Sequence, residues 1–311
     1  MLEKGYILVV TYNRLECLKK CINSILNQTY SNVEIIIIDD CSKDDTNKEF
    51  SNYHDKRVRY YLNDKNSGMG FNRQKGYNLS TGDFVIFADD DDYFIDFEYF
   101  KNTINIFESD NNISLICSHT LIHYEVENEY KFYRLNIPKK ISSMEYLKKF
   151  QFKYRKPTST FPLIIRKSTM EQANFKAMAM MNDSSIYLRA LMIPGMVYLY
   201  NHIIGIYRVH GMNDTLNAKA EFTIENLEEK KYVYDYLLAN NKFNRINKWY
   251  SKQIMITVKH FLNGKENNKN KIKMVFSWIR KNVEFITYIK AVLYLNKKIL
   301  KGKKIIKNEN K

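Results

Sequence analysis

The residues best suited to chemistry are four consecutive aspartates, Asp89, Asp90, Asp91 and Asp92. Adjacent carboxylates repel one another, so a folded chain keeps four of them together only where water or a cation offsets the repulsion. Oxygen ligands of this kind suit Mg²⁺ or Mn²⁺, which keep one or two protein carboxylates and complete their coordination with phosphate oxygens. A solvated acidic loop is the alternative reading. Because an apolar strand precedes the run and apolar residues follow it, we expect a site for Mn²⁺ or Mg²⁺.

A second pair of carboxylates, Asp39 and Asp40, directly follows another apolar run. A carboxylate at the end of a strand can accept a hydrogen bond from a nucleotide base or from a ribose hydroxyl. The alternative is a turn in which Asp44 or Asp45 caps the next helix, and both interpretations can hold for different aspartates.

A glycine-rich segment, residues 66–76, comes between these two acidic clusters. Gly68 and Gly70 permit close approach of the backbone to a ligand, and Arg73 can pair with a phosphate. The segment lacks the Lys-Ser/Thr pair of a Walker loop, so alone it is a weak signal.

The elements that must position these residues alternate between strand and helix. Apolar, β-rich runs predict strands, and spacings of three and four predict helices. The expected strands are 6–12, 33–38, 58–62, 83–88, 113–123, 160–166 and 196–200, and the expected helices are 15–26, 70–79, 142–150, 168–173 and 183–191. This alternation is typical of an α/β fold with a mainly parallel sheet, whose strand carboxyl ends bring the polar clusters together at one edge.

Taken together in order, these segments resemble the family 2 glycosyltransferases, inverting enzymes with the GT-A nucleotide-sugar-binding fold. The matching segments are TYNR at 11–14, SILNQTY at 24–30, IDDCSKD at 38–44, NSG at 66–68, NRQKG at 72–76 and GDFVIFADDDD at 82–92. The resemblance covers roughly residues 8–210. Two positions depart from the family pattern: Val10 replaces a usual proline, and Cys41 replaces a usual glycine.

The resemblance implies a nucleotide-diphosphate sugar as donor, with uridine favoured. It implies that Tyr12 packs on the base, that Asp40 accepts from the base ring, that Asp89 contacts the ribose and that Asp91 binds the metal. Because four aspartates are adjacent, Asp90 or Asp92 is the alternative metal ligand. The residues expected to bind the donor are Thr11, Tyr12, Arg14, Asp40, Arg73, Asp89 and Asp90.

The same resemblance implies a catalytic base late in the domain, in an acidic pair that opens a helix with an arginine about two turns later. Asp183 with Arg189 fits this pattern, although Asn182 replaces the first acid of the pair. Asp183 is therefore the expected general base, and a mere helix cap is the alternative. His210 lies in a YRVH segment that resembles one returning to the site in this family. We expect it near the metal or the diphosphate, and a structural hydrogen bond is the alternative.

Charge divides the chain into two parts. Residues 216–311 contain 22 Lys and Arg against 8 Asp and Glu, whereas the first 215 residues contain 27 against 26. We therefore expect a GT-A catalytic domain over 1–215 and a basic, mainly helical domain over 216–311. Basic helices with aromatic side chains can bind an anionic membrane surface, and the alternative is a packed helical domain with solvated lysines. No nucleic-acid recognition motif is found.

The expected function is metal-dependent transfer of a sugar to a hydroxyl of a glycan or lipid-linked acceptor in cell-surface polysaccharide synthesis. The four cysteines, the absence of a leader-like start and the absence of a long apolar stretch predict a cytoplasmic protein, peripheral at the inner face of the membrane. The alternatives are a non-catalytic, membrane-associated partner on the same fold and a nucleotidyltransferase.

Overall fold

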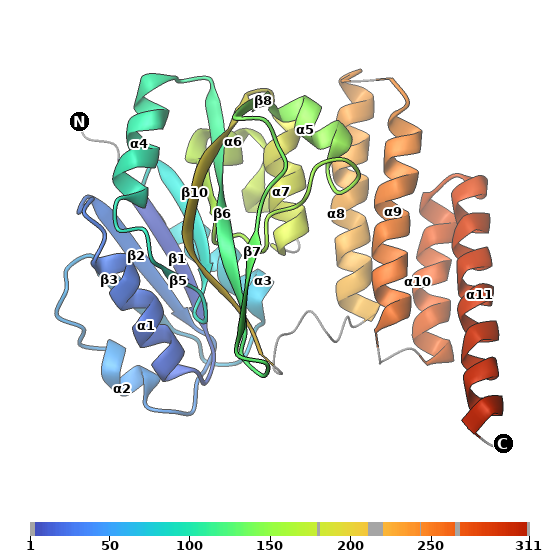
Figure 1. The fold of residues 1–311 in the computed structure, drawn as a ribbon, viewed down its shortest axis with the longest axis horizontal. Helices are drawn as coiled ribbons and strands as arrows, with labels where there is room; N and C mark the ends of the chain where they lie inside the picture. Colours follow the sequence, from blue (N-terminus) through green and yellow to red (C-terminus); the bar gives the residue numbers. More distant parts are fainter. Residues whose placement is uncertain (1–3, 179–180, 211–219, 243, 265–267, 310–311) are drawn as a thin grey trace. The chain divides into compact units, whose positions relative to one another are not determined.

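The computed structural model describes residues 4–178, 181–210, 220–242, 244–264 and 268–309. The chain divides into two compact units, Met1–Gly211 and Met212–Lys311. The first is an α/β unit and the second consists of helices, as Figure 1 shows for each. The domain boundary expected between 215 and 216 falls outside the described residues.

Four parallel strands form the first half of a ten-stranded sheet, in the order β3-β2-β1-β4. These strands are β1 (Gly5–Thr11), β2 (Val33–Asp39), β3 (Val58–Leu62) and β4 (Phe84–Asp89). The helices that follow the first three are α1 (Leu15–Leu26), α2 (Thr46–Phe50) and α3 (Met69–Leu79). The predicted α/β fold with parallel strands is therefore confirmed, and the carboxyl ends of β1, β2 and β4 lie at one edge.

Helices cover both faces of this half of the sheet (Figure 1). Alternate side chains of β1 and β2 on one face join a core with α1 and with α4 (Tyr99–Ser109). On the other face α3 packs against β1 so closely that a Cβ at Gly76 would lie 2.0 Å from Leu8 Cδ1. Only glycine fits there, and the close approach fixes the helix that carries Arg73.

The second half of the sheet is mixed and continues in the order β9-β6-β10-β5. Its strands are β5 (Tyr93–Phe94), β6 (Ile113–Tyr124), β7 (Glu129–Tyr133), β8 (Lys140–Ser142), β9 (Leu163–Arg166) and β10 (Met196–Val209). Strand β9 is antiparallel to both β4 and β6, while β10 runs parallel to β6. Strand β10 extends nine residues beyond the predicted end at 200 because register shifts near Tyr200 and Ile203 let it continue past an exposed polar stretch.

Three short helices and one 3-10 turn complete the α/β unit. They are α5 (Ser143–Lys149), α6 (Lys167–Gln172), η1 (Phe175–Ala177) and α7 (Asp183–Met192). Helix α7 is almost wholly buried, and its Arg189 donates to the carbonyl oxygen of Ala173 at 3.1 Å. This anchors the helix that presents Asp183.

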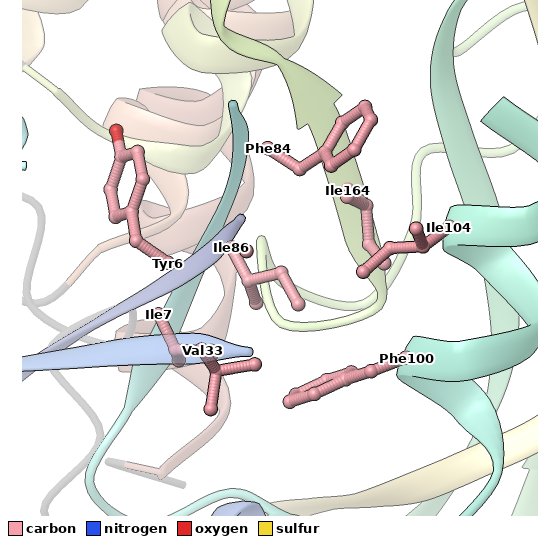
Figure 2. Close-up of a pocket in the computed structure, with 9 residues that line it drawn as sticks. Tyr6, Ile7, Val33, Phe84, Ile86, Phe100, Ile104 and Ile164 are labelled. Carbon is pink, nitrogen blue, oxygen red and sulfur yellow. The ribbon is translucent and has the colours of Figure 1, made fainter. Parts of the chain in front are cut away.

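A small apolar cavity lies inside the core, between the strands β1 and β4 and helix α4 (Figure 2). Ile7, Ile86, Phe100 and Ile104 are among the side chains around it. Its volume of about 10 Å³ is at the lower limit for one water molecule, and its lining offers no polar side-chain partner. It is a packing gap of the core and not a ligand site.

The described residues of the second unit form four helices, with α8 against α9 and α10, and α11 against α9 and α10. They are α8 (Ala220–Ala239), α9 (Ile246–Asn263), α10 (Lys269–Asn282) and α11 (Phe285–Glu309). Side chains such as Leu227, Ile254 and Ile279 are fully buried between them. Among the described residues, no helix combines the length and apolar character that crossing a bilayer requires.

Candidate active site

The carboxyl ends of β1, β2 and β4 place three polar segments side by side. The backbone N–H of Asp40 donates to the carbonyl oxygen of Thr11 at 2.9 Å, which joins the ends of β2 and β1. The hydroxyl of Thr11 donates to Asp90 Oδ2 at 2.7 Å, which joins β1 to the segment after β4. The convergence expected from strand order is thus present in the structure.

The four aspartates at the end of β4 fall into two groups, whose carboxylates have different neighbours. The backbone N–H of Asp92 donates to the carbonyl oxygen of Asp89 at 3.1 Å and closes a turn. One carboxylate oxygen from each of Asp89, Asp91 and Asp92 lies within 4.8 Å of the others. Asp90 is apart from this set, because its Oδ2 accepts from Thr11 and from Arg14 Nε at 3.1 Å. Burial raises the pKa of Asp90 to about 7 even though Arg14 opposes that shift.

The donor set suits a divalent cation. Asp91 Oδ2 lies 2.8 Å from His210 Nε2 and 2.8 Å from Arg14 Nη1. Both distances are those of hydrogen bonds to one carboxylate oxygen, and the possible ligand atoms that lie within 4.8 Å of one another belong to Asp89, Asp91 and Asp92. Carboxylate oxygens with one imidazole nitrogen match the preferences of Mn²⁺ and, less closely, of Mg²⁺. The residues present therefore fit the expected metal.

Arg73 connects the aspartates to helix α7. Its side chain is 1% exposed, and its Nη2 donates to Asp89 Oδ1 at 2.7 Å. Its Nη1 donates to Asp183 Oδ1 at 3.1 Å and to the carbonyl oxygen of Met181 at 3.1 Å. Sequence alone indicated a phosphate partner for Arg73, whereas the structure shows its guanidinium bridging two carboxylates.

Helix α7 begins with Asp183, but Asp183 does not cap it. The N-cap is Asn182, whose Oδ1 accepts from the backbone N–H of Ser185 at 3.0 Å, while Ser185 Oγ accepts from the backbone N–H of Asn182. This capping box satisfies the first turn of the helix without Asp183. The asparagine that departs from the family pattern therefore has a structural role, and the carboxylate of Asp183 is left to face Arg73 and Lys156.

Asp183 is held in its ionised form. Burial raises its pKa, but the charges of Lys156 and Arg73 outweigh burial, so the pKa lies below its ordinary value. Lys156 Nζ lies 3.5 Å from Asp183 Oδ2, on the opposite oxygen from Arg73. A general base must be ionised and within reach of a donor proton, and this carboxylate meets the first condition.

Asp40 and Tyr12 lie at the same edge of the sheet. Asp40 Oδ1 accepts from the backbone N–H of Ser67 at 2.7 Å, and Oδ2 accepts from the backbone N–H of Gly68 at 2.9 Å. Burial raises the pKa of Asp40, but these bonds and those from Asn72 and Asn63 lower it below its ordinary value. The ring of Tyr12 is 44% exposed at the end of β1 and offers an open aromatic face.

Sequence reasoning missed three contacts of the site. Lys156 pairs with Asp183, Ser159 Oγ donates to Asp92 Oδ2 at 3.2 Å, and the backbone N–H of Arg208 donates to Asp92 Oδ1 at 3.3 Å. Lys156 and Ser159 lie in an irregular segment with no periodicity or motif that would single them out. Arg208 belongs to the YRVH segment, in which the resemblance assigns a role only to His210.

The chain belongs to glycosyl transferase family 2, whose family model matches residues 6–177. Among curated proteins it is 40% identical over 94 residues to the GalNAc(5)-diNAcBac-PP-undecaprenol β-1,3-glucosyltransferase of Campylobacter jejuni, which covers 29% of this chain and 30% of that one. It is 38% identical over 94 residues to the glycosyltransferase GlyA of Streptococcus pneumoniae, covering 29% of this chain and 13% of that one. The matched segment thus spans less than a third of each relative.

Solved structures share the fold. Residues 1–349 of TarS from S. aureus, in complex with UDP-GlcNAc, align with a TM-score of 0.65 at 15% identity, covering 93% of this chain and 81% of that one. A mannosyltransferase from Pyrobaculum calidifontis, in complex with GDP-Man and Mn²⁺, aligns with a TM-score of 0.50 at 10% identity, covering 97% and 87%. The fold is therefore GT-A-like with a C-terminal helical region.

Proposed function

We propose that this protein is an inverting, metal-dependent glycosyltransferase that moves a sugar from a nucleotide-diphosphate donor to a hydroxyl of a glycan or lipid-linked acceptor. The observation that carries the proposal is the bridge from Asp89 through Arg73 to Asp183. It holds an acidic metal set and an ionised carboxylate at a fixed separation, which is the arrangement that a direct displacement between donor and acceptor needs.

The donor is placed by the residues at the sheet edge. We assign Tyr12 to the base as a stacking surface, and Asp40 to a base N–H, which would replace one of its present side-chain donors, Asn63 or Asn72. UDP is the favoured nucleotide, and the TarS structure that shares the fold is a complex with UDP-GlcNAc. Thr11 and Arg14 hold Asp90 and Asp91 in position, and Asp89 is assigned to the ribose.

The chemistry follows from Asp183. Its carboxylate removes the proton of the acceptor hydroxyl while the acceptor oxygen bonds to the anomeric carbon and the bond to the diphosphate breaks, which inverts that carbon. A divalent cation held by Asp91 and His210, with Asp89 and Asp92 beside it, would neutralise the leaving diphosphate. Arg73 and Lys156 hold the base in position and keep it ionised before the acceptor arrives.

The helical unit is assigned to an anionic membrane surface. Phe285, Ile289 and Leu293 recur every four residues on α11 and are 77%, 37% and 62% exposed, while Thr287 and Ala291 are buried on the other side. Lys290 and Lys297 are exposed on the same helix, within a region of net charge +14. An apolar stripe flanked by lysines complements anionic headgroups and the acyl boundary below them, and vesicle binding tests the assignment.

A non-catalytic partner on the same fold is the second candidate. A binding protein has no need of an ionised carboxylate joined to the acidic set through an arginine, which makes the contacts of Asp183 the feature that favours an enzyme. The family match sets aside the nucleotidyltransferase alternative.

The test is release of nucleotide from a panel of UDP- and GDP-sugars, with Mn²⁺, with Mg²⁺ or with EDTA. Wild type is compared with Asp91→Ala and with Asp235→Ala, a control that removes an exposed aspartate of α8. We expect one donor to be cleaved only with metal, and Asp91→Ala to slow cleavage about 100-fold or more, because a metal ligand stabilises the leaving group by several kcal/mol. Asp235→Ala should match wild type.

Tight binding of a nucleotide sugar without turnover, with and without candidate acceptors, would favour the non-catalytic partner. Metal-independent release that survives Asp91→Ala would contradict the role of the aspartates. The absence of binding to every donor would overturn the proposal as a whole.

A further inference from the structure

An open cleft of about 420 Å³ adjoins the proposed base, and no ligand has been assigned to it so far. Its walls come from β6, β7, β10 and residues 151–158, the irregular segment after α5. Lys156 lines the cleft and contacts Asp183, while Tyr207 lines it beside Arg208, whose backbone N–H donates to Asp92. Through Lys156, the cleft therefore adjoins Asp183, the proposed base.

The two oxygens of Asp183 face different parts of the molecule. Oδ1 accepts from Arg73, which also binds Asp89 on the proposed donor side. Oδ2 faces Lys156, which lines the cleft. Since a base must reach the hydroxyl that it activates while that hydroxyl faces the anomeric carbon of the donor, the cleft beside Oδ2 is on the side from which an acceptor would approach.

The charges that line the cleft favour an anionic ligand. Two cations, Arg155 and Lys156, line it, and its described lining includes no acidic residue. Lys156 is partly neutralised by Asp183. Arg155 is exposed, and among the residues that the structure describes no carboxylate pairs with it; its Nη1 is 3.4 Å from the carbonyl oxygen of Arg134. Its Nε and Nη2 make no hydrogen bond to the described residues, so the guanidinium can still bind a phosphate through two hydrogen bonds.

The segment that carries this arginine is fixed before any ligand binds. The backbone N–H of Arg155 donates to Asn136 Oδ1 at 2.7 Å, and its carbonyl oxygen accepts from Tyr146 Oη at 2.7 Å. Tyr133 Oη donates to the carbonyl oxygen of Lys156 at 2.7 Å, and the Arg155 guanidinium lies 5.7 Å from the centre of the Tyr133 ring. A positioned cation loses less freedom on binding than one on a loose loop.

We propose that this cleft is the acceptor site and that the acceptor carries a phosphate group, bound by Arg155, next to the hydroxyl that receives the sugar. Tyr133, Tyr207 and Ile122 supply apolar surface for the rest of the acceptor. The phosphate can belong to a lipid diphosphate or to a phosphodiester within a polymer. The assignment of the hydroxyl rests on the proposed function, while the recognition of phosphate by Arg155 does not.

The test measures binding by isothermal titration calorimetry with EDTA present, so that no phosphate binds through a cation at the aspartates. The probes are a short-chain prenyl diphosphate N-acetylglucosamine, a glycerol phosphate trimer and the uncharged methyl glycoside of N-acetylglucosamine. Wild type is compared with Arg155→Gln and with Lys101→Gln, which removes the same charge from an exposed site on α4. Thermal melting checks that all three proteins are folded.

We expect at least one phosphate probe to bind wild type, and Arg155→Gln to weaken it about tenfold, the loss typical of one charged hydrogen-bonded contact. Lys101→Gln should bind the phosphate probe as tightly as wild type does. Arg155→Gln should leave the affinity for the methyl glycoside unchanged. Binding of the prenyl probe alone assigns the phosphate to a lipid, and binding of the trimer alone assigns it to a polymer. The proposal is overturned if neither phosphate probe binds, or if Arg155→Gln and Lys101→Gln weaken binding equally. Metal-dependent release of nucleotide by wild type reports separately on the proposed function.

Discussion

Cys41 adopts a backbone conformation that side chains disfavour. Its φ is 69°, in the left-handed region, two residues after the end of β2 and next to Asp40. A residue with a Cβ pays about 1–2 kcal/mol to adopt this conformation, and glycine does not. This explains in physical terms why a glycine is usual at this position, a departure that the sequence alone left without a reason.

We expect Cys41→Gly to be more stable than Cys41→Ala by about 1 kcal/mol, because both substitutions remove the thiol and only glycine relieves the backbone. Urea denaturation of the two variants and of wild type measures the difference. Equal stability of the two variants would show that the backbone at this position is not strained.

From the sequence, the residues that could do chemistry at the site were easier to predict than the contacts that these residues make. Asp89 and Asp91 were singled out because they lie at or just after the end of a predicted strand, and Asp183 because it opens a predicted helix in a segment that resembles the family; their roles stay predictions. The bridge through Arg73 was not predicted, because its partner Asp183 lies 110 residues away and no local pattern encodes that contact. The same reason hid Lys156, whose segment has no regular structure.

Helix α7 is the element on which the proposed base depends. Its capping box involves Asn182 and Ser185, and the buried helix offers few other partners for its first N–H groups. An N-cap side chain contributes about 1 kcal/mol, so a loss of the cap would fray the turn that holds Asp183.

We therefore expect Asn182→Ala to lower the free energy of unfolding by about 1 kcal/mol, and Asn182→Asp to lower it less, because aspartate also caps helices. Urea denaturation at neutral pH measures both. Sugar transfer should fall more in Asn182→Ala than in Asn182→Asp. If the alanine variant were as stable as wild type, the capping box would not support the helix.

Among whole elements, those with strong periodicity were predicted closely. The expected strand 58–62 and helix 183–191 agree with β3 and α7 to within one residue. The strand predicted to end at 200 continues in the structure through the polar residues Asn201 and His202, because the register of β10 shifts there. The antiparallel strand β9 shows that a run of apolar residues does not reveal strand direction.

For the molecule as a whole, the division of charge is the dominant feature. The α/β unit is nearly neutral, and the helical part carries almost all of the net +15. A charge of this size acts over about a Debye length and weakens with salt, so its effect is measurable as a salt dependence.

We expect the full chain to sediment with vesicles that contain phosphatidylglycerol and to bind pure phosphatidylcholine weakly, with binding that falls between about 50 and 500 mM salt. The double variant Phe285→Ser and Leu293→Ser should bind about tenfold more weakly, because each side chain loses apolar burial at the interface. Val126→Ser, which removes an 82% exposed valine of the α/β unit, is the control. Equal binding to both lipids at about 50 mM salt would contradict the assignment.

Arg73 has a consequence for how this sequence can vary. A buried guanidinium between two carboxylates tolerates the loss of neither partner easily, because breaking a buried pair costs about 3–5 kcal/mol. Positions 73, 89 and 183 should therefore change together or not at all among related chains. A natural variant that has lost the acid at 183 should also have lost the arginine at 73, and such a pair of losses would mark a descendant that has kept the fold and abandoned the reaction.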